Sequence, residues 1–328
     1  MGPAAATRWR ALSGNVRGIL FMLMSAVVFS TMGGLIKYVG DELHTFQVVF
    51  FRCLFGLLVL LPFIRREGLG ILRTARPGLH AIRVSIGIMA MFCLFHAITH
   101  MPLAAAISIT YARPLFMIVL AVLVLGEVVR WRRGLATLAG FIGVLIVMRP
   151  DPAALDLNAL AALASAALIA GALTMVKVLS ATERPLTILM WFAIGAVITS
   201  AVPAALVWRW PEPGTWVLVV LIGAAASGGQ YLAVRAYREG EASLVTPLDY
   251  SQILWATLIG VLVFAEIPDG WTLTGAVVIV ASALYIVYRE TRLGRRAIPH
   301  GGDAPGPDPD AAPDQDTGRR AGDEPRPS

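Results

Sequence analysis

The sequence has little charge and almost no cysteine. Only 15% of its 328 residues are Asp, Glu, Lys or Arg, against about 25% in soluble domains, while 57% are hydrophobic. The mean hydropathy of +0.72 is that of a chain whose solvent is lipid. The two cysteines, Cys53 and Cys93, lie inside apolar runs, which excludes a disulfide framework and a zinc-ribbon spacing. We therefore expect a membrane protein and not a soluble enzyme.

The chain also lacks the motifs of membrane enzymes and ATP-driven pumps. It contains no DDxxD-like cluster, no P-loop, no G-x-S-x-G and no HExxH. A lipid or prenyl transferase needs chelating acidic residues or a His-Asp pair at the membrane surface. A polytopic membrane enzyme and a non-transporting membrane receptor stay as alternatives. We expect a secondary transporter of a small organic metabolite that uses no cofactor.

Apolar runs long enough to cross a bilayer occur repeatedly. A hydrocarbon core about 30 Å thick needs about 20 apolar residues in a helix. Pro102 divides the third run from the fourth, because a single helix of both would be about 45 residues long. The expected fold class is an all-α polytopic membrane protein with ten transmembrane helices, at residues 17–38, 44–64, 80–100, 103–125, 131–149, 157–178, 186–207, 215–237, 242–265 and 270–289.

Lys and Arg residues alternate between the two sides of these spans. Roughly 22 of the 27 lie in segments that are cytoplasmic if the N-terminus is, whereas Lys37, Arg149 and Arg209 lie in the opposite segments. This positive-inside bias predicts a bacterial-type inner-membrane protein with both termini in the cytoplasm. The clusters form no basic face, so no nucleic-acid partner is expected despite a net charge of +6. Lys37, at a span end, is expected to snorkel to the surface.

The chain repeats itself at a shift of 139 residues, which places Tyr111 over Tyr250 and Glu127 over Glu266. Each Glu ends a span, where we expect it to meet Arg or backbone groups. Because five spans is an odd number, the halves must be inverted in the membrane, as in many secondary transporters with a midplane site. The expected parts are a cytoplasmic segment (1–16), a first repeat (17–149), a periplasmic linker (150–156), a second repeat (157–289) and a disordered cytoplasmic tail (290–328).

Some of these segments resemble a known family. Pro114-Leu115, Leu125-Gly126-Glu127 and Gly140 to Val144 look like the first half of the EamA family in the drug/metabolite transporter superfamily. The second half departs from the pattern at Ile253, where a proline would match Pro114, and at Ala265, which replaces the glycine. The resemblance implies a ten-helix fold that moves a small organic solute. Within the family, the chain is similar to S-adenosylmethionine uptake and riboflavin transporters at residues 43–52, 247–250 and 266–269.

Two opposite charges lie deep in corresponding spans. Asp249 is the only carboxylate well inside a predicted span, and Arg113 lies near the middle of the fourth. A charge at the bilayer centre costs roughly 2.5–3.5 kcal/mol on insertion scales, so each needs a partner or a function. We expect the two to approach one another, where they either line the solute path or only neutralise each other. Asp249 is also a candidate for proton coupling, because burial favours its neutral form.

Polar and aromatic side chains near these charges suit a flat or amphipathic solute. Tyr and Trp stack on rings or cations, and glutamine amides both donate and accept. Packing between helices is the alternative for each of them. The candidate solute-binding residues are Arg113, Asp249, Tyr111, Tyr250, Gln230, Tyr231, Gln252 and Trp255.

Three further residues have a structural interpretation. Arg52, in the second span, is expected to bond helix-end carbonyls or a neighbouring helix. His96 and His100 have the i, i+4 spacing of a metal site, but only Cys93 lies near enough to extend it, so no metal is expected. The expected partners are a small-molecule substrate and the lipid bilayer. Substrate identity, direction of transport, coupling ion and a homodimer against a monomer stay open.

Overall fold

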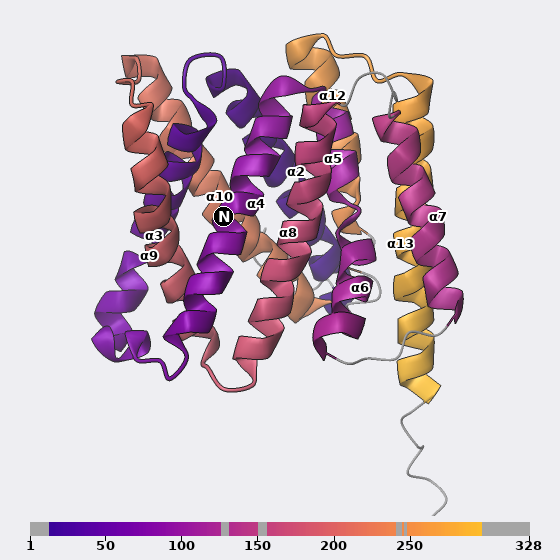
Figure 1. Ribbon diagram of the computed structural model, residues 1–328, viewed down its shortest axis with the longest axis horizontal. Coiled ribbons are helices and arrows are strands. Elements are labelled where there is room, and N and C mark those ends of the chain that lie inside the picture. Colours follow the sequence, from indigo (N-terminus) through magenta and orange to yellow (C-terminus); the bar gives the residue numbers. More distant parts are fainter. Residues whose placement is uncertain (1–12, 126–130, 150–155, 241–244, 246–247, 297–328) are drawn as a thin grey trace, which may run out of the picture.

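The computed structural model describes residues 13–125, 131–149, 156–240, 245 and 248–296. These residues form α-helices and one short 3-10 helix and no strand, which confirms the all-α expectation (Figure 1). The elements are α2 (Gly14–Val39), α3 (Thr45–Glu67), η1 (Leu69–Leu72), α4 (Pro77–His100), α5 (Leu103–Thr110), α6 (Arg113–Leu125), α7 (Trp131–Met148), α8 (Leu157–Ser180), α9 (Pro185–Leu206), α10 (Pro213–Glu239), α12 (Ser251–Phe264) and α13 (Gly270–Arg296).

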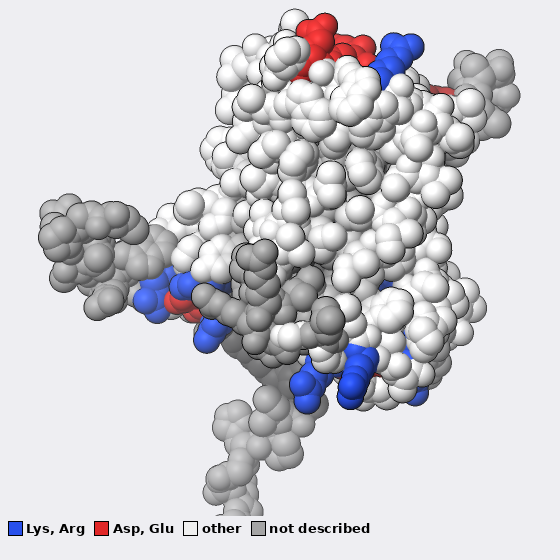
Figure 2. All heavy atoms as spheres, turned by 90° about the vertical axis from the view of Figure 1, so that its left-hand side faces the viewer, with Lys and Arg blue, Asp and Glu red and all other residues white. Residues whose placement is uncertain are grey.

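The described helices include six that are long and apolar enough to cross a bilayer. The large side chains Leu123, Leu206 and Leu262 are 75%, 83% and 73% exposed, as expected where lipid surrounds the protein. Figure 2 shows charged side chains at the two ends of the molecule with an uncharged band between them. The chain is therefore a multi-pass membrane protein. The six helices are 14–39, 77–100, 103–120, 157–180, 185–206 and 213–239, and shorter apolar helices lie at 45–59, 138–148, 251–264 and 270–282.

Proline and glycine shape the bundle. α4, α9 and α10 each begin with a proline, whose missing N–H is no loss in the first turn of a helix. Glycines then let helices approach closely. A Cβ on Gly18 of α2 would lie 2.7 Å from the Cα of Gly240, and one on Gly143 of α7 would lie 2.9 Å from Val278 of α13. α13 continues past residue 289 to Arg296, so the first seven residues of the tail predicted to be disordered are helical, and the rest of that tail lies outside the described residues.

The two halves of the chain pair reciprocally. The most extensive contacts join α2 to α10, α4 to α8, and α7 to α13 (Figure 1). Under a shift of about 140 residues, α2 corresponds to α8 and α4 to α10, so the first two interfaces are counterparts of one another. α3 corresponds to α9, and these two also pack together. This exchange of partners is typical of two halves related by a pseudo-twofold axis.

The fourth predicted span is broken in the middle. α5 ends at Thr110 and α6 begins at Arg113, so the helix expected over residues 103–125 consists of two pieces. Pro114 has no N–H to donate to the Thr110 carbonyl and disfavours helical geometry at the residue before it. The Thr110 hydroxyl in turn donates to the carbonyl of Ala106, a contact that often bends helices. In the second half, α12 begins at Ser251, directly after Tyr250, the counterpart of Tyr111.

Candidate functional site

Two buried tyrosines meet where the corresponding helices break. Tyr111 lies between α5 and α6, Tyr250 directly precedes α12, and their ring centroids are 4.8 Å apart at an angle of 41°. The Tyr111 hydroxyl donates to the backbone carbonyl of Asp249 at 2.6 Å and lies 2.8 Å from the side-chain oxygen of Gln252. Ser30 of α2 donates to the Gln252 carbonyl at 3.0 Å. The sequence repeat therefore brings its two tyrosines together within one hydrogen-bonded group.

Arg113 and Asp249 face each other beside these tyrosines. Nη2 of Arg113 is 3.7 Å from Oδ2 of Asp249, and the Arg113 guanidinium lies 5.0 Å from the centre of the Tyr111 ring. The two charged side chains are 30% and 32% exposed. At that distance the charges attract each other but do not form a hydrogen bond. The expected approach of the two groups is present, and their role in binding a solute stays a prediction.

Two donors on the first turns of α12 lack a hydrogen-bond partner in the described part of the chain. They are the buried hydroxyl of Ser251 and the buried indole N–H of Trp255. One helical turn separates them, so they lie on the same face of α12. Unpaired buried donors are uncommon in proteins and require an explanation, for which a bound ligand or water is the usual one. Trp255 is a predicted site residue, whereas Ser251 escaped prediction because an isolated serine in a helix carries no signal.

Gln230 and Tyr231 are not brought into this group. Both lie on an exposed face of α10, and Tyr231 is 60% exposed. The Tyr231 hydroxyl accepts a hydrogen bond from Arg235 at 3.2 Å. The reason is helical geometry, because α10 turns its small residues such as Gly229 inward against α2. Gln230 and Tyr231 are therefore on a different face of α10 from the residues that pack against α2.

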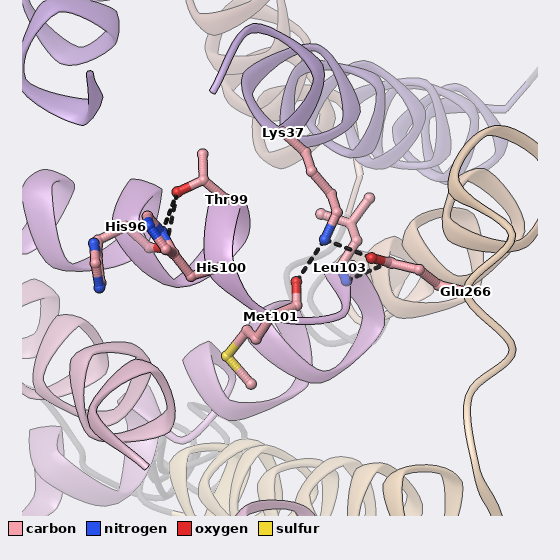
Figure 3. Close-up of polar contacts among 7 residues, drawn as sticks. All are labelled: Lys37, His96, Thr99, His100, Met101, Leu103 and Glu266. Atoms are coloured by element: carbon pink, nitrogen blue, oxygen red, sulfur yellow. Dashed lines mark hydrogen bonds and ion pairs between the residues drawn. The ribbon is translucent and has the colours of Figure 1, made fainter. Parts of the chain in front are cut away.

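A second, tighter group joins α2, the start of α5 and the segment after α12 (Figure 3). Nζ of Lys37 is 2.5 Å from Oε1 of Glu266 and donates to the carbonyl of Met101 at 2.7 Å. Oε2 of Glu266 accepts from the backbone N–H of Leu103, the first residue of α5, at 2.9 Å. The Lys37 and Glu266 side chains are only 13% and 20% exposed. We call these four residues the outer clasp.

The outer clasp corrects one expectation and supports another. Lys37 was expected to snorkel, and this is wrong, because it turns into the protein toward Glu266 and Met101. Glu266 does meet a backbone group, as expected, although its basic partner is lysine and not arginine. Its counterpart Glu127 lies outside the described residues.

His96 and His100 hydrogen-bond within the protein. Their rings are stacked with centroids 4.1 Å apart, and Nε2 of His96 lies 3.1 Å from Oδ1 of Asn158. Nδ1 of His100 lies 2.8 Å from the Thr99 hydroxyl (Figure 3). Within the residues that the structure covers, no group of three or more His, Cys, Asp or Glu side chains lies together.

Comparison with known proteins gives a consistent result. The family model described as "EamA-like transporter family" matches residues 16–149 and again 157–288. The S-adenosylmethionine uptake transporter of Rickettsia prowazekii is 30% identical over 282 residues, covering 86% of this chain and 96% of that protein. The riboflavin transporter of Rhizobium johnstonii is 30% identical over 284 residues, covering 86% and 94%.

Two further similarities extend this result. The pseudopaline exporter of Pseudomonas aeruginosa is 30% identical over 272 residues, covering 81% of this chain and 94% of that protein. A solved crystal structure matches with a TM-score of 0.58 at 21% identity, covering 85% of this chain and 99% of the other. At that identity the match concerns the fold alone.

Proposed function

Because the chain belongs to the EamA-like transporter family, it is a transporter and not an enzyme, and we propose that it carries a compact solute with both a positive and a negative group. S-adenosylmethionine has this character, since it combines a sulfonium with an amino-acid carboxylate. The proposal makes the group around Tyr111 and Tyr250 the solute site.

The loose pair of Arg113 and Asp249 is the observation that carries the proposal. At 3.7 Å and about one-third exposed, the two charges are near enough to compensate one another but are free of a mutual hydrogen bond. A solute that offers a carboxylate to Arg113 and a cation to Asp249 replaces one weak pair with two strong ones. The tyrosine rings beside them supply faces for the cation or for a flat ring.

The proposed transport route is alternating access between two inverted five-helix repeats. We propose ten spans with both termini on the cytoplasmic side of a bacterial-type inner membrane. The arginine distribution and the reciprocal packing of α2 on α10 and of α4 on α8 support this arrangement. Helix breaks at both Tyr111 and Tyr250 support hinges at the same depth in each repeat.

The outer clasp then acts as the closure on the periplasmic side. α5 is eight residues long, with the clasp at its start and Tyr111 directly after its end. α12 runs from the tyrosine pair back toward Glu266. The same two helices are thus tied together at the solute site and at the surface, so access from outside requires Lys37 and Glu266 to release Met101 and Leu103.

Asp249 has two roles that the charge pattern allows. As a proton carrier it couples uptake to the proton gradient, and as a fixed anion it binds the cation of the solute. Solute exchange in the absence of a gradient distinguishes these two roles, because exchange needs solute binding but no net movement of protons.

A panel of solutes tests the proposed class. We expect S-adenosylmethionine to raise the thermal midpoint of the purified full chain by mass action, with a smaller effect from the uncharged flat ring system of riboflavin. Uptake into proteoliposomes checks that binding leads to transport. Stabilisation by riboflavin without any effect of S-adenosylmethionine would overturn the zwitterionic class, and the absence of both effects would overturn the solute assignment as a whole.

A further inference from the structure

Arg52 is a cation at membrane depth without an acidic partner. It lies two turns after Thr45, the first residue of α3, or about 10 Å along the helix axis. A guanidinium remains ionised in proteins. Two other cations in the bundle do have acidic partners, since Arg113 faces Asp249 and Lys37 binds Glu266. Among the described residues, no carboxylate lies within ion-pair distance of Arg52.

The contacts that Arg52 does make are weak. Its Nη1 lies 3.0 Å from the sulfur of Met91 on α4, and the Cys53 thiol is a second sulfur neighbour. Its Nε is buried and has no hydrogen-bond partner in the described part of the chain. Thioether and thiol sulfurs are poor acceptors. The sequence-based expectation allowed bonds to helix-end carbonyls or to a neighbouring helix, and the second is present as the contact with Met91 of α4. The guanidinium nevertheless has no oxygen acceptor among the described residues.

The surroundings of Arg52 belong to the interior of the bundle. α3 packs against α4, α9 and α10. One turn further along, a Cβ on Gly56 would lie 3.7 Å from the hydroxyl of Ser227 on α10. Arg52 itself is only partly buried, so part of its side chain stays accessible.

Arg83 shows what a compensated arginine looks like in the same bundle. Its Nε and Nη1 are also buried without hydrogen-bond partners among the described residues. Its guanidinium, however, lies 4.1 Å from the centre of the Phe192 ring, a cation–π contact that offsets part of the burial. It lies about 9 Å along α4 from Pro77, a distance from the helix start similar to that of Arg52. Arg52 has no such aromatic contact among the described residues.

We propose that Arg52 binds the oxyanion of the transported solute, a carboxylate or a phosphate, at a second point on its path. The planar guanidinium fork matches such a group with two parallel hydrogen bonds. The inference rests on the proposed function, because the solute supplies the missing counter-charge. Arg52 then joins the pair of Arg113 and Asp249 as a residue that selects solutes with an oxyanion. When the site is empty, Arg52 has no strong partner.

The resting stability of variants gives the first test. Arg52→Met removes an uncompensated charge and keeps an apolar side chain of similar length. We expect its thermal midpoint without solute to equal or exceed that of the wild type, because no native partner is left unpaired. Arg52→Lys keeps the charge, and Arg83→Met is the matched control. A fall of more than about 5 °C in Arg52→Met alone would overturn the proposal, because it would identify Arg52 as a structural residue.

Transport gives the second test. We expect Arg52→Met to lower proteoliposome uptake of S-adenosylmethionine at least tenfold, with partial activity in Arg52→Lys and wild-type activity in Arg83→Met. Uptake at the wild-type rate in Arg52→Met overturns the proposal. Decarboxylated S-adenosylmethionine tests whether the carboxylate is the group that Arg52 binds, because its uptake should then be equally poor in wild type and Arg52→Met. A loss on Arg52→Met that is the same for both compounds overturns the assignment to the solute oxyanion.

Absence of S-adenosylmethionine uptake in the wild type would contradict the proposed solute but not the role of Arg52. A phosphate titration tests that role separately. Inorganic phosphate at constant ionic strength should then raise the thermal midpoint of the wild type and of Arg83→Met by about 2 °C more than that of Arg52→Met. Equal shifts in all three proteins would contradict the assignment of Arg52 as an anion-binding residue.

Discussion

Two ion pairs in this protein lie near the two ends of α12 and differ in almost every respect. The outer clasp is tight, with Lys37 and Glu266 at 2.5 Å and both groups also bonded to backbone atoms of the α4–α5 junction. The central pair of Arg113 and Asp249 is separated by 3.7 Å and is about one-third exposed. A pair whose remaining donors and acceptors are satisfied by the protein holds elements together, whereas a loose pair leaves capacity for another molecule. This contrast supports the proposal that the clasp is a closure and the central pair a binding site.

The largest effect on stability should come from breaking the clasp on one side. Glu266→Ala leaves Lys37 without its counter-charge and the Leu103 N–H without an acceptor, so we expect a loss of about 3 kcal/mol in unfolding free energy. Thermal unfolding of the full chain checks this. The control is Asp269→Asn, which disrupts the exposed pair of Arg149 and Asp269 and should cost less than about 1 kcal/mol. Equal losses of unfolding free energy in the two variants would contradict the view that the clasp is stronger than an ordinary surface ion pair.

The largest effect on transport should come from Arg113→Ala. We expect uptake to fall at least tenfold, with a smaller loss of stability than in Glu266→Ala because Asp249 is partly exposed and bonds little. The double variant with Asp249→Ala should remain inactive. Recovered uptake in the double variant would show that the two residues only neutralise each other, since that change removes the charge imbalance.

Asp249→Asn should show whether Asp249 couples transport to protons or binds the solute. If Asp249 carries a proton, the variant loses gradient-driven accumulation and keeps solute exchange, and if it binds the cation, exchange is lost as well. Accumulation at the wild-type rate between about pH 5.5 and 8 would exclude both roles. The measurement is uptake and counterflow in the same proteoliposomes.

The smallest effect should come from the hydroxyl of Tyr111. Tyr111→Phe removes the hydrogen bond to the Asp249 carbonyl and keeps the ring, so we expect a loss of about 1 kcal/mol in stability and a severalfold decrease in uptake. Tyr250→Phe is the matched control on the symmetry-related residue. A larger loss of uptake in Tyr250→Phe than in Tyr111→Phe would contradict the importance that we assign to the Tyr111 hydroxyl.

Much of the fold can be predicted from the sequence, because the lipid bilayer requires each spanning helix to be apolar along its length. A spanning helix needs a long apolar run, and every described α-helix lies in or over one of the predicted ranges. Within the fourth span, Pro114 frees a backbone carbonyl and so predicts a bend. The sequence does not tell whether the helix only bends there or divides into α5 and α6, because the apolar composition does not change at that point.

The site could be predicted only in part. Arg113, Asp249, Tyr111, Tyr250 and Gln252 were found because each is a polar or aromatic exception inside an apolar span, and the repeat related them to one another. Tyr231 met the same criterion but lies on the outside of α10. The sequence cannot tell which face of an almost uniformly apolar helix points inward. The clasp was missed because a lysine at a span end looks the same whether it turns outward or inward.

The affinity of the purified protein for S-adenosylmethionine, compared between wild type and the Arg113→Ala/Asp249→Ala double variant, tests the central claim most directly. The double variant removes both charges together, so it leaves no unpaired group that would complicate folding. The account predicts that the dissociation constant rises at least tenfold, equivalent to about 1.4 kcal/mol, while the thermal midpoint without solute stays close to that of the wild type. Unchanged affinity in the double variant would contradict it, because the solute would then bind elsewhere in the protein.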